Sequence, residues 1–210
     1  PASFVSAPLD SETPTELELS DLLRFFRNPS RYFFTQRLKV HFETRESGAE
    51  DDEPFKVEGL DDYQLKQRYL ATALAGESLD QVDAWIQAEG LLPVGQSGYQ
   101  SLNKVRKDCS ELAEKLEPLM TETARRREIR IKLPNLPTLR LTGWQDGWYG
   151  STLLRYRPAQ VQGYDRLFGW IEHLCACACF GDTQATIHRG LSAQLTYHPL
   201  GRDEAIQRSE

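Results

Sequence analysis

Three side chains in the second half of the chain have the spacing of a metal-dependent phosphodiester hydrolase but not its charges. Asp146 lies just before an expected turn, and Arg155 and Arg157 follow on the next expected strand, with one residue between them. Because side chains alternate along a strand, these two arginines should share one face. A hydrolytic site of this layout would need an acid and a lysine there. Mg²⁺ requires charged oxygen ligands, and the lysine orients the attacking water or the phosphate.

The layout resembles that of the PD-(D/E)xK nucleases, but arginine is incompatible with their chemistry. A carboxylate about 4 Å from Mg²⁺ attracts it by about 8 kcal/mol at an effective dielectric constant of about 20, and a guanidinium repels it by a similar amount. Arginine also has no lone pair for a metal and stays protonated in proteins. We therefore expect a degenerate nuclease site with no catalytic residue, no metal and no cofactor.

Each of the three side chains has alternative roles. Asp146 could be a residual metal ligand or a turn residue that binds nearby backbone amides, and we favour the turn. Arg155 and Arg157 could contact a partner's carboxylates or a DNA phosphate, or they could form an internal ion pair with Asp146. The sequence does not decide between these two roles. The enzymatic alternative is a weak metal-dependent nuclease that recruits acids from elsewhere, such as Glu122, Glu128 or Glu172.

A basic run accompanies these positions. Between residues 121 and 160, 8 basic residues stand against 3 acidic ones, a local charge of +5 in a chain whose formal net charge is −6. The run could follow a phosphate backbone and make the chain an autonomous DNA-binding domain, or it could be a solvated strand edge, which we favour. The DNA-contact candidates are Arg125, Arg126, Arg127, Arg130 and Lys132.

Two groups of aromatic side chains could bind partners or fill the core. Trp144, Trp148 and Tyr149 surround the expected turn and are candidates for contact with a protein partner or for a cap over the sheet. A second group lies near the N-terminus, where it could stack bases, but its helical spacing favours core packing. Its members are Phe25, Phe26, Tyr32, Phe33 and Phe34.

The cysteines do not predict a metal site. Cys175, Cys177 and Cys179 alternate with alanines and lack the two-residue gap of a zinc knuckle. Together with Cys109 they are expected to be small core residues in a reducing compartment. His173 and Cys177 lie one helical turn apart, and two ligands do not make a zinc site.

The hydrophobic pattern predicts a mostly helical part over about residues 19–120 and a sheet-containing core over about residues 121–210. Ser20 is the expected N-cap of the first helix, and Pro29 should begin the second after a break at Asn28. Further helices are expected over residues 59–75, 78–90, 102–119 and 164–180, with the start of another over 201–210. Three antiparallel strands are expected over residues 128–133, 139–141 and 152–157, with turns at 134–137 and 147–150, and two short strands within 183–197.

These elements predict an α/β fold, in which an antiparallel meander and flanking helices form a PD-(D/E)xK nuclease-like core behind the helical N-terminal part. Residues 1–18 are expected to be a flexible segment and residues 19–210 one domain. Residues 41–54 are expected to form an acidic, solvated loop, or a contact for a basic partner. The chain shows no signal peptide and no long apolar run, so we expect a cytoplasmic protein without a membrane span. It begins at Pro1 without a Met, which suggests a piece of a longer protein.

Several blocks of sequence, in order along the chain, resemble the C-terminal domain of RecC, the gamma subunit of exodeoxyribonuclease V (the RecBCD complex). The first is LSDLLRFFRNPSRYF at residues 19–33, followed by QRL at 36–38. Later blocks are EPF at 53–55, EGLDDY at 58–63, GLLPVG at 90–95, LRYRPA at 154–159 and WIEHL at 170–174. Their number and order make the resemblance specific.

The resemblance implies the fold of the RecB nuclease without its active site, whose acid and lysine correspond to Arg155 and Arg157. It implies a non-catalytic role in a complex for double-strand break repair and recombination, with RecD and RecB subunits as partners. The domain is expected to help assemble that complex, notably by docking the RecD helicase. DNA contact is implied as a secondary role, near the path of the unwinding strands. The parts of RecC that recognise Chi are absent from this chain, so Chi recognition is not expected of it.

Overall fold

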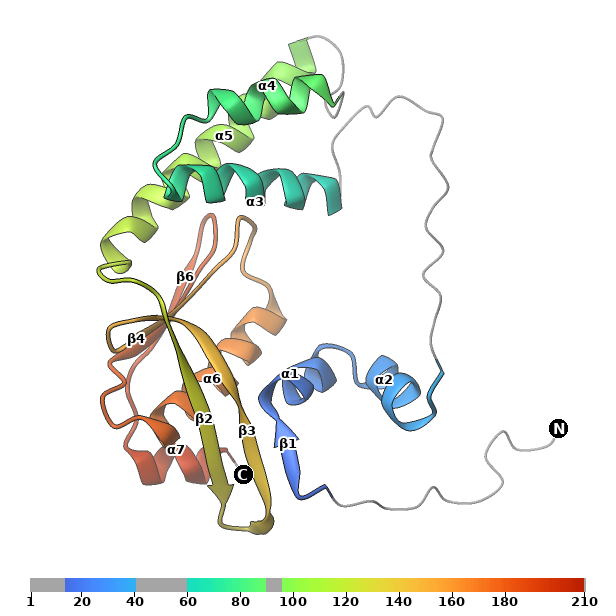
Figure 1. The fold of residues 1–210 in the computed structure, drawn as a ribbon, viewed down its shortest axis with the longest axis vertical. Coiled ribbons are helices and arrows are strands. Elements are labelled where there is room, and N and C mark those ends of the chain that lie inside the picture. The colour runs from blue at the N-terminus through green and yellow to red at the C-terminus, as the bar shows by residue number, and fades with distance from the viewer. Residues whose placement is uncertain (1–13, 41–59, 90–95, 210) are drawn as a thin grey trace, which may run out of the picture.

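The computed structural model describes residues 14–40, 60–89 and 96–209, and shows a mixed sheet flanked by helices (Figure 1). The helices in these ranges are α1 (Leu19–Arg27), α2 (Pro29–Tyr32), the π-helical turn η1 (Phe33–Arg37), α3 (Leu60–Leu74), α4 (Asp80–Ala88), α5 (Gln96–Leu116), the 3-10 turn η2 (Glu117–Leu119), α6 (Gly163–Cys179) and α7 (Arg202–Arg208). The strands are β1 (Glu16–Glu18), β2 (Arg125–Leu133), β3 (Leu136–Tyr149), β4 (Thr152–Tyr156), β5 (Ala185–Arg189) and β6 (Gln194–Tyr197). The expected α/β class and helical N-terminal part are confirmed, whereas the nuclease-like core stays a prediction.

The long strand β3 organises the sheet. The strand order is β1-β3-β4-β5-β6, and β2 also pairs with β3. Both β1 and β2 pair with residues 140–142 of β3, so they lie on its opposite edges. Strand β4 pairs with Trp148 and Tyr149 on the same edge of β3 as β1. Residues 143–147, between the two pairings, have no strand partner on this edge among the described residues, and we call it the divided edge of β3.

The expected meander is present, since β2, β3 and β4 are antiparallel neighbours. The expected turn at residues 147–150 is wrong, because β3 continues to Tyr149 and the chain turns at Gly150 and Ser151. Trp148 is fully buried and its ring meets that of Phe180 edge-on at 5.4 Å, which holds this end of the strand in the core. Asp146 therefore lies within a strand.

Two glycines let neighbouring segments approach the divided edge of β3. Gly143 has a φ of +148°, and a Cβ there would lie 3.0 Å from the Cβ of Leu19. Gly147 has a φ of +77°, and a Cβ there would lie 2.8 Å from the carbonyl oxygen of Leu154. Residues other than glycine rarely adopt these φ angles. Glycine therefore allows α1 and β4 to come close to the same edge.

Helix α6 connects β4 to the parallel strand β5 and supplies much of the core. Cys109, Cys175 and Cys177 are buried, Cys179 is partly buried, and all four are free thiols. The predicted core role is therefore confirmed for the three buried cysteines. His173 is also buried, where Nδ1 lies 3.0 Å from the Thr186 hydroxyl and Nε2 lies 2.8 Å from a backbone carbonyl. Backbone and hydroxyl partners therefore satisfy this imidazole without a metal.

Helices α3, α4 and α5 form a layer at one end of the sheet (Figure 1). Its core contains Tyr69, Ile86 and Leu116, all fully buried, and reaches Leu154 and Ile187 of the sheet. The three expected helices are confirmed with shifted ends. Helix α4 begins two residues later than expected, and α5 begins six residues earlier and ends before η2.

The helical hairpin of α1 and α2 differs from the prediction in two ways. The N-cap of α1 is Glu18, whose carboxylate accepts a hydrogen bond from the Ser20 hydroxyl at 3.0 Å. The expected core packing of the aromatic group is wrong for Phe25, Phe26 and Phe33, which are exposed. Helix α1 instead buries the side that carries Leu19 against the core of β2, β3 and α6. The predicted break at Asn28 is confirmed, and the amide oxygen of Asn28 caps α2 by accepting the backbone N–H of Arg31.

Some expectations lie outside the described residues, namely the first 13 residues of the flexible segment, the acidic loop at 41–54 and the last residue of the helix expected over 78–90. The last three residues of the expected flexible segment, Glu16–Glu18, form β1. None of the helices in the described ranges is long and apolar enough to cross a membrane.

Candidate functional site

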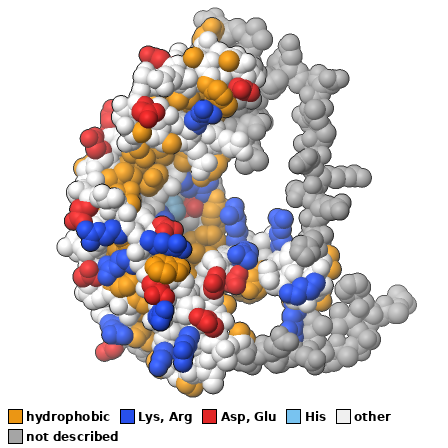
Figure 2. Space-filling model, viewed as in Figure 1, with side chains coloured by type: hydrophobic (Ala, Val, Ile, Leu, Met, Phe, Trp, Pro, Cys, Tyr) orange, Lys and Arg blue, Asp and Glu red, His pale blue; other side chains and the backbone are white. Residues whose placement is uncertain are grey.

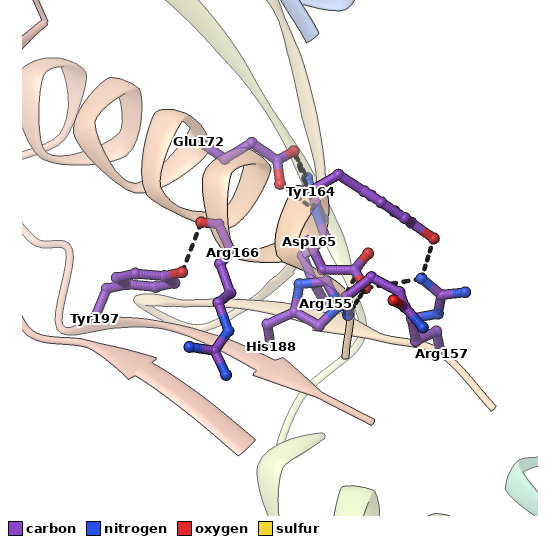
Figure 3. A network of polar contacts seen from close by, with 9 residues as sticks. Arg155, Arg157, Tyr164, Asp165, Arg166, Glu172, His188 and Tyr197 are labelled. Carbon is purple, nitrogen blue, oxygen red and sulfur yellow. Dashed lines mark hydrogen bonds and ion pairs between the residues drawn. The ribbon is translucent and has the colours of Figure 1, made fainter. Parts of the chain in front are cut away.

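Arg155 lies on β4 and Arg157 directly after its last residue, and both point toward helix α6, where two carboxylates receive them (Figure 3). The two arginines face the same way because they are two residues apart in extended chain. Asp165 and Glu172 are seven residues apart on α6, about two turns, so they also share a face. Each arginine therefore has its own acid.

Arg155 binds Glu172 through two sides of its guanidinium. Its Nε lies 3.1 and 2.9 Å from the two carboxylate oxygens, and Nη2 lies 2.6 Å from Oε1. The pair is mostly buried, with 24% of the Arg155 side chain and 11% of the Glu172 side chain exposed. Nη1 donates to the backbone carbonyl of Asp146. This guanidinium thus ties β4 to α6 and to the divided edge of β3.

Arg157 forms the second pair. Its Nη1 lies 2.7 Å from Oδ2 of Asp165 and also contacts the hydroxyl of Tyr164. The same carboxylate oxygen accepts a hydrogen bond from the backbone N–H of Gln162 at 2.7 Å, as part of the capping box of α6. Burial lowers the pKa of Arg157, but the hydrogen bonds to Tyr164 and Asp165 outweigh it and leave the pKa above its ordinary value. The cap therefore orients the acid that neutralises the arginine.

His188 lies beside this pair on β5, opposite Arg155 in the parallel register. Its Nε2 is 3.9 Å from Oδ1 of Asp165, and its buried Nδ1 has no hydrogen-bond partner among the described residues. Burial lowers the pKa of His188, the two neighbouring acids raise it, and Arg157 and Arg155 lower it, for a net decrease. These surroundings therefore favour the neutral imidazole over its protonated form.

Asp146 does not lie in a turn, and its side chain does not pair with Arg155 or Arg157. Its side chain is 75% exposed and pairs with Nε of Arg126 at 3.2 Å. Only its carbonyl oxygen meets Arg155. The hypothesis that Arg155 and Arg157 pair internally with Asp146 is therefore wrong, because helix α6 places two other carboxylates closer to them.

No group of three or more His, Cys, Asp or Glu side chains that could hold a metal ion occurs in the described ranges 14–40, 60–89 and 96–209. The acids considered for the enzymatic alternative do not converge. Glu122 pairs with Arg125 at 3.3 Å, Glu128 pairs with Arg130 at 2.7 Å, and Glu172 pairs with Arg155. Each of these acids already has an arginine neighbour.

The basic candidates on β2 are mostly paired with acids. Arg127 forms a two-nitrogen bridge to Asp182, at 2.9 and 3.3 Å, and its guanidinium lies 3.7 Å from the ring centroid of Phe180. Arg126 pairs with Asp146, and Arg125 and Arg130 pair with glutamates. Lys132 is exposed. Four of the five DNA-contact candidates therefore carry local neutralising partners.

The three aromatic partner-contact candidates differ in exposure. Trp144 is exposed, with the guanidinium of Arg126 at 4.7 Å from its ring centroid. Tyr149 is partly buried and packs against the helical core. Trp148 is fully buried, so its proposed role as a surface anchor is wrong and the alternative cap over the sheet fits it. Trp144 is thus the most accessible of the three.

The acids that receive the arginines were missed from the sequence as ion-pair partners. The sequence suggests Glu172 only as a recruited metal ligand and gives Asp165 no role at the site. Their spacing of two helical turns, on the helix that directly follows the arginine strand, was the available signal.

Comparison with known proteins agrees with the resemblance noted in the sequence. The family model described as RecC C-terminal domain matches residues 14–208. A RecBCD enzyme subunit RecC from Escherichia coli (strain K12) is 28% identical over 95% of the chain, which corresponds to 17% of that relative. The RecC subunits of Buchnera aphidicola and Mycolicibacterium smegmatis are 24% and 27% identical over 90% and 86% of the chain, or 17% and 16% of those relatives. The chain thus spans about a sixth of the length of these curated relatives.

Proposed function

The chain belongs to the family of RecC C-terminal domains, and we propose that it is a non-catalytic module with a nuclease-like core in a RecBCD-type complex. In this proposal it assembles with the RecD and RecB subunits and positions unwinding DNA during double-strand break repair and recombination. The name RecBCD enzyme subunit RecC, which its relatives carry, supports this assignment of the parent protein. The parent complex would be an exodeoxyribonuclease V whose cleavage is carried out by another subunit.

The observation that carries the non-catalytic part is the pairing of Arg155 with Glu172. A divalent ion near this carboxylate would face a fixed positive charge, and the guanidinium already binds both carboxylate oxygens. Replacing that contact with a metal would require removing the arginine from a mostly buried position, where an unpaired charge is costly. The arginine thus stabilises the arrangement of β4 and α6 while it disfavours metal binding.

The assembly part is supported by an aromatic side chain at the surface. Exposed aromatic rings are enriched among the residues that anchor protein interfaces. Trp144 on β3 is exposed in the described structure. This ring is the proposed contact for a neighbouring subunit.

The catalytic question is tested by incubating the 210-residue chain with linear DNA and Mg²⁺ or Mn²⁺, and by titrating each metal in a calorimeter. We expect no cleavage and no saturable metal binding. Reproducible cleavage that is abolished by Asp146→Ala would refute the non-catalytic role, because Asp146 is the surviving acid of the nuclease layout. A matched Asp182→Ala variant controls for the loss of an exposed carboxylate.

The assembly question is tested with a complete RecC subunit that carries this chain as its C-terminal domain. We expect deletion of the domain to abolish co-purification of RecD, and Trp144→Ser to weaken it. Tyr99→Ser is the matched control, since Tyr99 is an exposed ring on α5. RecD capture that is unaltered by the deletion would contradict the proposal.

A further inference from the structure

A basic pocket lies in the helical hairpin near the N-terminus, away from the β2 arginines. Its volume is about 630 Å³, and it opens between α1 and the segment formed by α2 and η1. Figure 2 shows basic side chains gathered over these helices. The lining residues are Arg24, Arg27, Asn28, Arg31, Tyr32, Thr35 and Gln36. Among the described residues, this lining holds three positive charges and no carboxylate.

The pocket offers mainly hydrogen-bond donors. Arg24 pairs with Asp21 at 3.0 Å, whereas Arg27 and Arg31 have no carboxylate partner within the described ranges. The amide oxygen of Asn28 already accepts the backbone N–H of Arg31 at 2.9 Å, which leaves its NH₂ group as a donor. Guanidinium groups that no described carboxylate neutralises, beside an amide donor, are suited to an oxyanion.

Contacts within the helical hairpin hold the shape of the pocket. The Asn28 cap fixes the start of α2. The Thr35 hydroxyl donates to the backbone carbonyl of Arg31 at 2.8 Å, which anchors it to the preceding turn. The rings of Phe25 and Tyr32 meet edge-on at 5.7 Å and hold α1 against α2. The arginines are therefore presented by a preformed turn.

The ring of Tyr164 is a common neighbour of Arg27 in this pocket and of Arg157 at the end of β4. The guanidinium of Arg27 lies 5.7 Å from the ring centroid of Tyr164, and that of Arg157 lies 5.4 Å from the same centroid. The Tyr164 ring is exposed, as are Phe25 and Phe26 on α1. Arginines that alternate with exposed rings are typical of surfaces that bind single-stranded nucleic acid, where phosphates contact the cations and bases stack on the rings.

We propose that this pocket binds the phosphodiester backbone of a single strand of nucleic acid, with Arg27 and Arg31 on the phosphate oxygens and Tyr164 as a stacking platform. The inference rests on the proposed function for the presence of DNA and adds where the strand is held. It differs from the basic run predicted on β2, because the arginines of that run are neutralised by acids in the fold. An acidic protein segment is the competing ligand, and the exposed rings favour nucleic acid over it.

The test measures binding of a fluorescein-labelled oligothymidylate of about 15 nucleotides, a length within the usual range of single-strand sites, to the 210-residue chain by anisotropy. We expect Arg27→Gln/Arg31→Gln to weaken binding at least about tenfold, and the salt dependence to fall by roughly 1.4 in log–log slope, since each neutralised phosphate contributes about 0.7. The matched variant Arg125→Gln/Arg130→Gln removes the same charge from exposed positions on β2. We expect it to change affinity by less than about twofold, because those charges are already paired.

Several outcomes would overturn the proposal. These are undetectable binding at low salt, an equal loss in the two double variants, and competition by polyglutamate at the same concentration as unlabelled oligonucleotide. Modification of the unmutated chain by phenylglyoxal gives a second measurement that does not depend on whether a variant folds. The oligonucleotide should protect Arg27 and Arg31 more than Arg125 and Arg130, and the reverse order would contradict the site. Loss of this site would leave RecD capture unchanged, so the two proposals fail separately.

Discussion

Replacing Arg155 with methionine tests whether its guanidinium holds β4, α6 and the edge of β3 together. Removing one partner of a buried ion pair costs about 3–5 kcal/mol, and a partly exposed pair costs less because water screens it. Only 24% of the Arg155 side chain and 11% of the Glu172 side chain are exposed, so this pair resembles a buried ion pair more than an exposed one. We therefore expect the free energy of unfolding to fall by about 2–4 kcal/mol. For a chain of this size the melting temperature should fall by roughly 5–15 °C.

The assay is urea unfolding followed by far-ultraviolet circular dichroism, with the wild-type chain as reference. Arg130→Met is the matched control, because Arg130 pairs with Glu128 at a similar distance, 2.7 Å, but on the exposed face of β2. An exposed pair contributes about 0–1 kcal/mol, so this control should change the free energy of unfolding very little. The double variant Arg155→Met/Glu172→Leu should recover most of the loss, since it leaves no buried charge without a partner.

Two results would refute this reasoning. If Arg155→Met costs no more than Arg130→Met, the guanidinium does not stabilise the junction of the three elements. If the double variant is as unstable as the sum of its single variants, the loss does not arise from an uncompensated charge on Glu172. Either result would remove the physical basis for a structural role of Arg155.

Three other predictions concern the same strands and the helical core. Gly147→Ala should cost about 2 kcal/mol or more in urea unfolding because of its positive φ and the nearby Leu154 carbonyl, whereas Gly163→Ala, which has open space around it, should be nearly neutral; equal effects would contradict the close approach. Asp146→Ala should change the free energy of unfolding by less than about 0.5 kcal/mol, since its side chain is exposed, and a loss of several times that value would show a buried role. Burial raises the pKa of Cys109 from 9.0 to about 12, so the unfolded thiol ionises first and stability, complete below pH 9, should fall as pH rises toward 12 by about 1.4 kcal/mol per pH unit. Cys109→Ala should flatten that slope in unfolding curves measured at several pH values, and an unchanged slope would exclude this thiol as a source.

The elements could be predicted from the sequence because each follows from a local pattern. Helical periodicity predicted α3, α4, α5 and α6, and alternation with turn residues predicted the meander and the two short strands that follow. The length of β3 was underestimated because Gly147 and Gly150 both resemble turn residues. Gly147 adopts its positive φ within a strand, and the pairing of Trp148 and Tyr149 with β4 shows that the strand continues.

The site divides in the same way between sequence and structure. Residue types alone determined that positions 155 and 157 carry fixed positive charges, since the charge of arginine does not depend on its surroundings. Which carboxylates meet them was decided by the packing of α6 on the sheet, which brings Asp165 and Glu172 to β4 and leaves the side chain of Asp146 in solvent. Pairing between segments depends on how their buried faces fit together, and the periodicity of one segment carries no information about that fit.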